Sequence, residues 1–351
     1  MGLPLPRNLL RPLHTISLLV LGLFVIQTIR SLPSRYSEDQ TKIFVADAAL
    51  APTHDVNWSR FAYVQYATSA SHVCNSLMIF ETLDRLHAKA DRVLIYPMEY
   101  SLGEDDNSTA SKLLRKARDQ YKVKLVPVQV QSQASGDATW ASSFTKLLAF
   151  NQTQYDRVLS LDSDATILTH MDELFLMPPC PIAMPQAYWM PESKLTSALM
   201  LITPSETEFA EVMNATKHSD ENMYDMEIVN RLYKDRALVI PHDPYILLTG
   251  EFRSHDHSSY LGKEGRWDPD EVLKRAKYLH FSDWPVPKPS DEPPVYILDE
   301  KKPGCHLSPD DREAEDCRDR YHWLDFYAEY SRRREVCYLS TPDPWLSPNS
   351  F

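Results

Sequence analysis

Hydrophobic and polar positions follow two different periods along the middle of the chain, and each period predicts one kind of element. Short runs rich in β-branched and aromatic residues predict strands at residues 60–68, 92–97, 123–130 and 157–162. Apolar residues that recur every three or four positions predict helices at residues 71–90, 108–121 and 141–153. Because strands and helices alternate, we predict an α/β fold with a mostly parallel sheet covered by helices on both faces.

Outside this alternating part the pattern is less regular. Residues 197–204 predict a strand, residues 222–235 predict a helix, and a last helix is predicted at residues 324–338 after a proline-rich segment. Residues 31–57 are polar and contain prolines, which is typical of a stem.

The longest apolar run, Leu13 to Ile29, predicts a membrane anchor. Its length is at the short end of the about 17 to 25 residues that span a bilayer, which suits a thin early secretory membrane. A cleaved signal peptide is the alternative, but no small-x-small cleavage site follows the run. We therefore expect the following parts: a cytoplasmic tail at 1–12, the anchor at 13–29, a stem at 30–57, the main domain at 58–290 and a C-terminal extension at 291–351.

Four acceptor sequences for N-glycosylation follow the predicted anchor, and they favour a lumenal location for the main domain. Their asparagines are Asn57, Asn107, Asn151 and Asn214. Coincidence is the alternative explanation for such sequences. We expect a single-pass type II protein of the Golgi membrane.

The five cysteines fit an oxidising compartment in which one or two disulfides form. Cys305 and Cys317 flank an acidic loop and are the preferred pair. The chain has no C-x-x-C pair, which argues against a zinc site.

Composition and charge argue against one class of partner and one kind of nucleotide site. The 351-residue chain is globular in composition, with 43% hydrophobic and 25% charged residues. Its formal net charge of −12 argues against nucleic acid, because phosphate binding requires clustered lysine and arginine. With only eight glycines, the chain has no glycine-rich phosphate loop, so any nucleotide must have its phosphates held by other means, such as a metal.

Two carboxylates stand at the end of the strand predicted at residues 157–162, where charge is costly unless it is neutralised. Asp162 and Asp164 are one residue apart, so both can face a cavity beyond the carboxyl end of the strand, where such sheets bind ligands. Their oxygens suit Mg²⁺ or Mn²⁺, which would bind a diphosphate and act as a Lewis acid on the leaving group. A pair of solvated loop carboxylates is the alternative.

The stretch FTKLLAFNQTQYDRVLSLDSDATILTHMDELF, residues 144–175, resembles glycosyltransferase family 8, the glycogenin-like retaining enzymes. The resemblance covers roughly residues 61–290 and implies a GT-A-like domain that binds a nucleotide sugar. It implies that Lys146 contacts the donor phosphates. A surface lysine is the alternative. The residues implied to contact the metal and the ribose are Asp162, Ser163 and Asp164.

The segment YLHFSDWPVPKP is similar to the family's last donor-binding segment. The resemblance implies that His280 is the third metal ligand and that Lys288 contacts the diphosphate. Two carboxylates and an imidazole favour Mn²⁺ over Mg²⁺, because nitrogen suits the harder ion poorly. The chain departs from the family in two ways: Asp283 replaces a glycine, and the gap between the histidine and the lysine is longer.

Two other segments resemble parts of the family's donor site. AYVQYATSASH resembles the opening strand, whose residues hold the uracil ring, although ordinary strand packing would also explain the tyrosine. The residues at those positions are Tyr66, Thr68 and His72. TSALMLITPS is similar to the sugar-binding strand and retains its serine, Ser197.

The segment YDMEIVN resembles the part of the family that places an Asp-Gln pair beside the reacting sugar. Asp225 matches the aspartate, Met226 replaces the amide, and a role for Glu227 is left open. The implied reaction is a front-face displacement in which the departing phosphate accepts the proton of the acceptor hydroxyl and Asp225 orients the sugar or the acceptor. A covalent intermediate on Asp225 is the alternative.

The chain looks most similar to the fungal branch of the family, described as Golgi N-acetylglucosaminyltransferases that act on mannose-containing glycans. This implies a UDP-N-acetylglucosamine donor and a glycan acceptor. UDP-glucose and UDP-galactose are alternative donors, because sugar discrimination depends on few contacts. Two other classes are an inactive lumenal scaffold with a degenerate fold and a hydrolase, whose carboxylates would lie about 5 to 10 Å apart across a sugar.

Overall fold

The computed structural model describes residues 56–103, 105–129, 144–190, 193–218, 223–263, 265–307 and 315–338. The predicted anchor and nearly all of the predicted stem lie outside these ranges. Within them, every helix is too short or too polar to cross a membrane.

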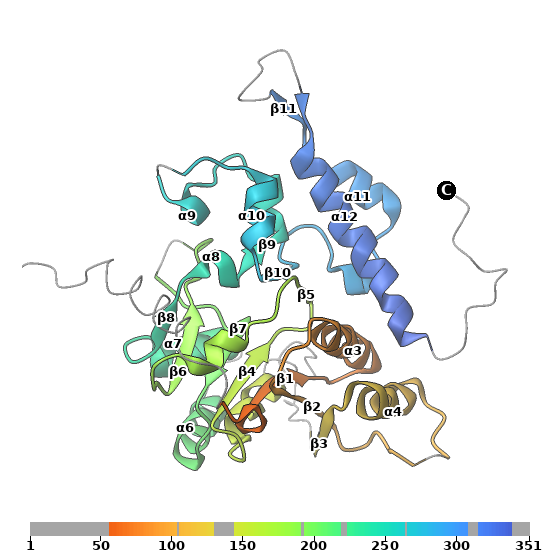
Figure 1. The fold of residues 1–351 in the computed structure, drawn as a ribbon, viewed down its shortest axis with the longest axis vertical. Helices are drawn as coiled ribbons and strands as arrows, with labels where there is room; N and C mark the ends of the chain where they lie inside the picture. Colours follow the sequence, from red (N-terminus) through yellow and green to blue (C-terminus); the bar gives the residue numbers. More distant parts are fainter. Residues whose placement is uncertain are drawn as a thin grey trace, which may run out of the picture. The chain divides into compact units, whose positions relative to one another are not determined.

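In the described part of the chain, seven strands form a mixed sheet in the order β3-β2-β1-β4-β7-β6-β8 (Figure 1). The strands are β1 (Phe61–Tyr66), β2 (Asp91–Pro97), β3 (Lys124–Val128), β4 (Arg157–Leu161), β6 (Ile182–Pro185), β7 (Leu199–Ile202) and β8 (Leu238–Ile240). The first four are parallel to one another, β7 is antiparallel to both of its neighbours, and β6 is parallel to β8. The predicted α/β fold with a mostly parallel sheet is confirmed.

The helices predicted between the first strands are present. Helix α3 (Ala70–Arg85) starts after Ser69, and α4 (Thr109–Tyr121) starts after Ser108; each serine hydroxyl accepts a hydrogen bond from a first-turn amide. The helix predicted at 141–153 is described from residue 144 and ends as the 3-10 helix η3 (Leu148–Asn151).

Most of the other helices in the described part lie in the second half of the chain. The α-helices are α6 (Glu206–Lys217), α7 (Asp225–Tyr233), α8 (His242–Tyr245), α9 (Ser258–Leu261), α10 (Pro269–Arg275), α11 (Val295–Lys301) and α12 (Arg318–Arg333). The 3-10 helices are η2 (Trp58–Arg60), η4 (Asp172–Leu176), η5 (Thr249–Arg253), η6 (Pro289–Asp291) and η7 (Arg334–Cys337).

Two hydrophobic clusters cover the two faces of the sheet. In β1, Tyr63 belongs to the cluster that contains Leu77 and Phe80 of α3, whereas Ala62 and Val64 belong to the other cluster. This division follows from the alternation of side chains along a strand. Since both faces are covered, the strand ends remain as the place where polar side chains gather.

A second, three-stranded sheet lies next to the carboxyl end of β4. It consists of β5 (Ala165–Ile167), β10 (Tyr278–His280) and β9 (Leu247–Leu248). The antiparallel ladder between β5 and β10 pairs Ala165 with His280. The turn that carries Asp162 and Asp164 connects β4 to β5, so this ladder sets His280 beside the two carboxylates. Its strands are too short to show a period, and the sequence did not predict them.

The C-terminal segment packs on α3 through α12 and η7. The buried residues of α12 are Trp323, Tyr327 and Tyr330, and the rings of the two tyrosines pack against Phe281. Tyr330 donates a 2.8 Å hydrogen bond to Asn75 Oδ1 of α3, and Cys337 forms a disulfide with Cys74 of the same helix. The helix predicted at 324–338 therefore starts earlier, at Arg318, and its end is bonded to the main domain.

Four of the five cysteines form disulfides. The predicted pair Cys305–Cys317 is confirmed, with a sequence separation of 12 residues. Cys305 precedes β11 (His306–Leu307) and Cys317 follows β12 (Glu315–Asp316), and these two strands pair with each other. The second pair, Cys74–Cys337, closes a separation of 263 residues. Cys180 is a free thiol.

We expect the double substitution Cys74→Ser and Cys337→Ser to lower the free energy of unfolding by about 2 to 4 kcal/mol, because a crosslink that closes a long loop restricts the unfolded chain. Denaturant titration measures this change. Cys180→Ser, which breaks no disulfide, is the control and should unfold like the parent. An unchanged unfolding midpoint in the double variant would contradict the expectation.

Candidate active site

Two carboxylates and one imidazole form the centre of the candidate site. His280 Nε2 lies 3.2 Å from Asp164 Oδ1 and 3.9 Å from Asp162 Oδ2. One ligand atom from each of the three residues lies within 4.8 Å of the others. Two carboxylate oxygens and a ring nitrogen at this spacing fit a divalent cation. The structure thus brings together the three predicted metal ligands, and their role stays a prediction.

Lys146 lies between two carboxylates on the other side of Asp162. Its Nζ is 2.7 Å from Asp162 Oδ1 and 2.7 Å from Asp225 Oδ2, and its side chain is 3% exposed. Burial disfavours the ammonium, but the charges of Asp162 and Asp225 outweigh burial and raise the pKa of Lys146. Nζ also lies 3.4 Å from Ser197 Oγ. The alternative that Lys146 is a surface lysine is wrong.

Asp164 has its own lysine. Lys288 Nζ lies 2.9 Å from Asp164 Oδ2 and donates a hydrogen bond to the carbonyl of Phe281. Burial would raise the pKa of Asp164, but His280 and Lys288 together hold that pKa below its usual range. Each carboxylate of the D-x-D turn is therefore paired with a lysine, and the alternative of solvated loop carboxylates is wrong.

Two tyrosine hydroxyls support the position of Asp162. Tyr66 donates a 3.0 Å hydrogen bond to Asp162 Oδ1, and Tyr278 donates a 3.0 Å hydrogen bond to the carbonyl oxygen of Asp162. Burial, followed by the nearby aspartates, raises the pKa of both tyrosines, so both remain neutral donors. Tyr278 was not predicted, because the three-residue strand that places it on the same side as His280 has no sequence signal.

The predicted uracil-binding residues other than Tyr66 lie at the start of α3. Thr68 Oγ1 and His72 Nδ1 are 2.9 Å apart. Burial lowers the pKa of His72, with the charge of Asp164 acting in the opposite direction. His72 therefore lies close enough to the D-x-D turn to interact electrostatically with Asp164. Ser163 lies within that turn, between the two carboxylates.

Asp225 is the first residue of α7, and the neighbouring residues fix its position. The Glu227 carboxylate accepts a 3.2 Å hydrogen bond from the Tyr224 amide, which caps the helix. Asn230 bonds both backbone groups of Leu195, at 2.9 and 2.7 Å. This pairing holds α7 against the segment that carries Ser197.

Asp283, where the family resemblance has glycine, is anchored to the C-terminal part of the chain. Its carboxylate accepts hydrogen bonds from Arg253 Nη1 at 2.6 Å and from Trp323 Nε1 at 2.7 Å, and its side chain is 5% exposed. Asp283 therefore ties the loop between His280 and Lys288 to η5 and α12. No sequence signal predicted Arg253 or Trp323 as partners.

No protein-family model matches the chain. The chain is 50% identical over 294 residues to glucose N-acetyltransferase 1 of Gibberella zeae, a match that covers 80% of this chain and 63% of that protein. It is 46% identical over 299 residues to the protein of the same name from Aspergillus fumigatus, covering 80% of this chain and 78% of that protein. The chain thus spans less than two thirds of the length of the first relative and more than two thirds of the second.

Among solved structures, the glycosyltransferase GlyE of Streptococcus pneumoniae TIGR4 has a similar fold. The TM-score is 0.50 at 16% sequence identity, and the match covers 78% of this chain and 62% of GlyE. The mixed α/β fold described above is therefore one that a glycosyltransferase uses. The sequence similarity goes further, since at 46% identity over more than two thirds of a relative the chain belongs to the glucose N-acetyltransferase 1 family.

Proposed function

We propose that this chain is a retaining, metal-dependent glycosyltransferase that moves N-acetylglucosamine from a UDP-sugar to a glycan acceptor. The observation that carries the proposal is the cluster of Asp162, Asp164 and His280 flanked by two lysines. N-acetylglucosamine is glucose with an N-acetylated amine, so the name of the curated relatives fits this sugar. The fold likeness to GlyE and the resemblance of residues 144–175 to glycosyltransferase family 8 support the same reaction class.

Asp162, Asp164 and His280 would hold the metal ion, and the mixed oxygen and nitrogen donor set favours Mn²⁺. When bound, the ion supplies Lewis-acid stabilisation of the leaving diphosphate. Lys146 and Lys288 stand on opposite sides of the two carboxylates and offer ammonium groups to phosphate oxygens. The site thus offers several positive contacts to a diphosphate without a glycine-rich loop.

The remaining residues are assigned to the uridine and the sugar. Thr68 and His72, which contact each other at the start of α3, bind the uracil, and Tyr66 bonds Asp162. Ser197 and Asp225 orient the sugar or the acceptor while the departing phosphate takes the proton of the acceptor hydroxyl. The Asp225 carboxylate pairs with Lys146, and a covalent intermediate on Asp225 stays the alternative.

The proposed location is the lumen of the Golgi, with residues 13–29 as the anchor of a type II protein. Two disulfides fit an oxidising compartment. The four asparagines of the glycosylation sequences are all exposed.

We expect release of UDP from UDP-N-acetylglucosamine to require Mn²⁺, to stop with a chelator, and to fall about 100-fold or more in Asp162→Asn, because that variant loses a charged ligand at the leaving group. A coupled UDP assay measures the rate. The matched control is Asp156→Asn, since Asp156 pairs with Arg60 before the amino end of β4. Equal rates in Asp162→Asn and the parent would rule out the proposed mechanism.

With mannosides as acceptors, we expect product from UDP-N-acetylglucosamine at a higher kcat/KM than from UDP-glucose or UDP-galactose, because the name of the relatives fits this sugar. Mass spectrometry of the product identifies the transferred group. A preference for another UDP-sugar would contradict the assignment of N-acetylglucosamine as the donor sugar, but it would still agree with glycosyl transfer from a UDP-sugar.

We expect Asp283→Ala to raise the KM for the UDP-sugar and to lower the free energy of unfolding by about 1 to 3 kcal/mol, because Arg253 and Trp323 lose their shared acceptor. The control is Asp299→Ala, whose carboxylate is exposed on α11 and pairs with Lys302. A variant as stable as the parent would show that the Asp283 contacts do not hold this loop.

A further inference from the structure

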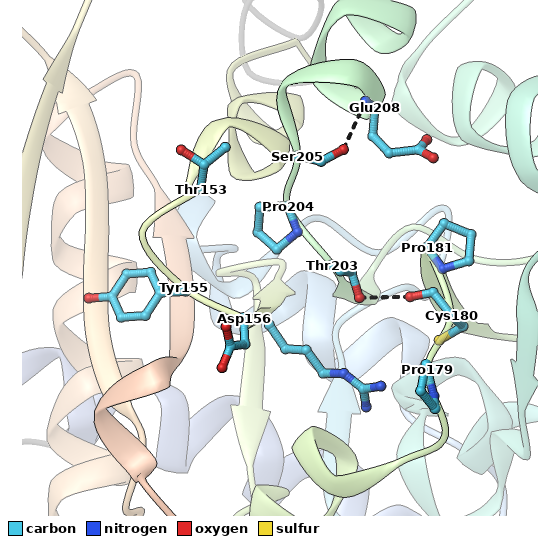
Figure 2. A pocket seen from close by; sticks show the side chains of 11 residues that line it. Thr153, Tyr155, Asp156, Pro179, Cys180, Pro181, Thr203, Pro204, Ser205 and Glu208 are labelled. Carbon is cyan, nitrogen blue, oxygen red and sulfur yellow. Dashed lines mark hydrogen bonds between the residues drawn. The ribbon is translucent and has the colours of Figure 1, made fainter.

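A cavity of about 730 Å³ opens at the amino end of β4, at the end of the strand opposite to the candidate active site (Figure 2). Three prolines, Pro179, Pro181 and Pro204, contribute apolar surface to its lining. The proposed transfer reaction uses none of the residues that line it.

The polar groups of this cavity are held in place by the protein itself. Thr203 Oγ1 donates a 2.7 Å hydrogen bond to the Cys180 carbonyl, as Figure 2 shows. The Arg157 guanidinium is buried and donates to backbone carbonyls at 3.2, 2.5 and 2.8 Å. The walls are therefore preformed, and they combine apolar proline surface with hydrogen-bonding groups, which suits a ligand with both an apolar face and hydroxyl or amide groups.

One of the four glycosylation sequences lies at this cavity. Thr153, the third residue of Asn151-Gln152-Thr153, lines the cavity. Asn151 is exposed at the end of η3, and two residues span at most about 7 Å. The third residues of the other sequences do not line it; they are Ser59, Thr109 and Thr216.

We propose that Asn151 carries an N-linked glycan whose first N-acetylglucosamine residues lie in this cavity. Sugar rings have apolar C–H faces that gain free energy when they cover proline surface, and their hydroxyl and N-acetyl groups bond to polar walls. The volume lies within the range of about 300 to 1,000 Å³ typical of small-ligand pockets, which gives room for one or two sugar residues.

The glycan would also cover Cys180, which lines the same cavity. All five cysteines lie in the described part of the chain, and Cys180 is the free thiol among them. In an oxidising compartment an accessible thiol forms disulfides between molecules, so a glycan over Cys180 protects the chain. The proposal rests on passage of the chain through the secretory route and not on the transfer reaction.

The test uses the full chain made in a fungal secretory host. Glycopeptide mass spectrometry should find a glycan on Asn151. Alkylation of Cys180 by N-ethylmaleimide under native conditions should be several-fold slower in the glycosylated parent than in Asn151→Gln or Thr153→Ala. Thr153→Ser keeps the acceptor sequence and should restore slow alkylation, and Asn57→Gln should leave the rate unchanged.

A second measurement does not depend on a variant that folds. Enzymatic removal of the glycan from the folded parent should raise the alkylation rate of Cys180 to that of Asn151→Gln. An unmodified Asn151 overturns the proposal, and so does a modified Asn151 with equal Cys180 rates before and after the glycan is removed. UDP release by the same preparations is measured separately, so failure here is distinguishable from failure of the transferase assignment.

Discussion

The ammonium of Lys146 between Asp162 and Asp225 is the interaction on which the candidate site depends. Asp162 at the end of β4 and Asp225 at the start of α7 lose hydration when they are buried, and a close opposite charge offsets the cost of that loss. Lys146 is almost fully buried, so its charge is hardly screened. Through Asp162, Ser197 and Asp225, Lys146 contacts the end of β4, the segment before β7 and the start of α7.

A second lysine completes the charge balance. Lys288 pairs with Asp164 as Lys146 pairs with Asp162, so each carboxylate of the D-x-D turn has one ammonium partner. Both carboxylates also lie within 3.9 Å of His280 Nε2. A protein that must hold a dinegative diphosphate benefits from such an arrangement, because the positive groups are already in place and need little reorganisation. This is the physical basis on which we propose phosphate binding for a chain with only eight glycines.

The C-terminal segment stabilises the same region from outside. Asp283 joins the loop between His280 and Lys288 to Trp323 of α12, while Tyr330 and Cys337 join α12 and η7 to α3. The loop that follows His280, a proposed metal ligand, and the helix that starts beside His72 are thus held by one segment. The Asp283 carboxylate accepts two hydrogen bonds that a glycine at this position could not make.

The sequence by itself determined the alternating strands and helices up to β4, because their hydrophobic period is a local property. It also determined the place of the D-x-D turn and the Cys305–Cys317 pair, which is close in sequence. Only the tertiary structure decided the contacts of Lys146 with Asp225, of Trp323 with Asp283 and of Cys74 with Cys337. Each joins residues far apart along the chain, and the strands that carry His280 and its neighbours are two or three residues long. Such contacts arise from the packing of distant elements, and no local pattern in the sequence records them.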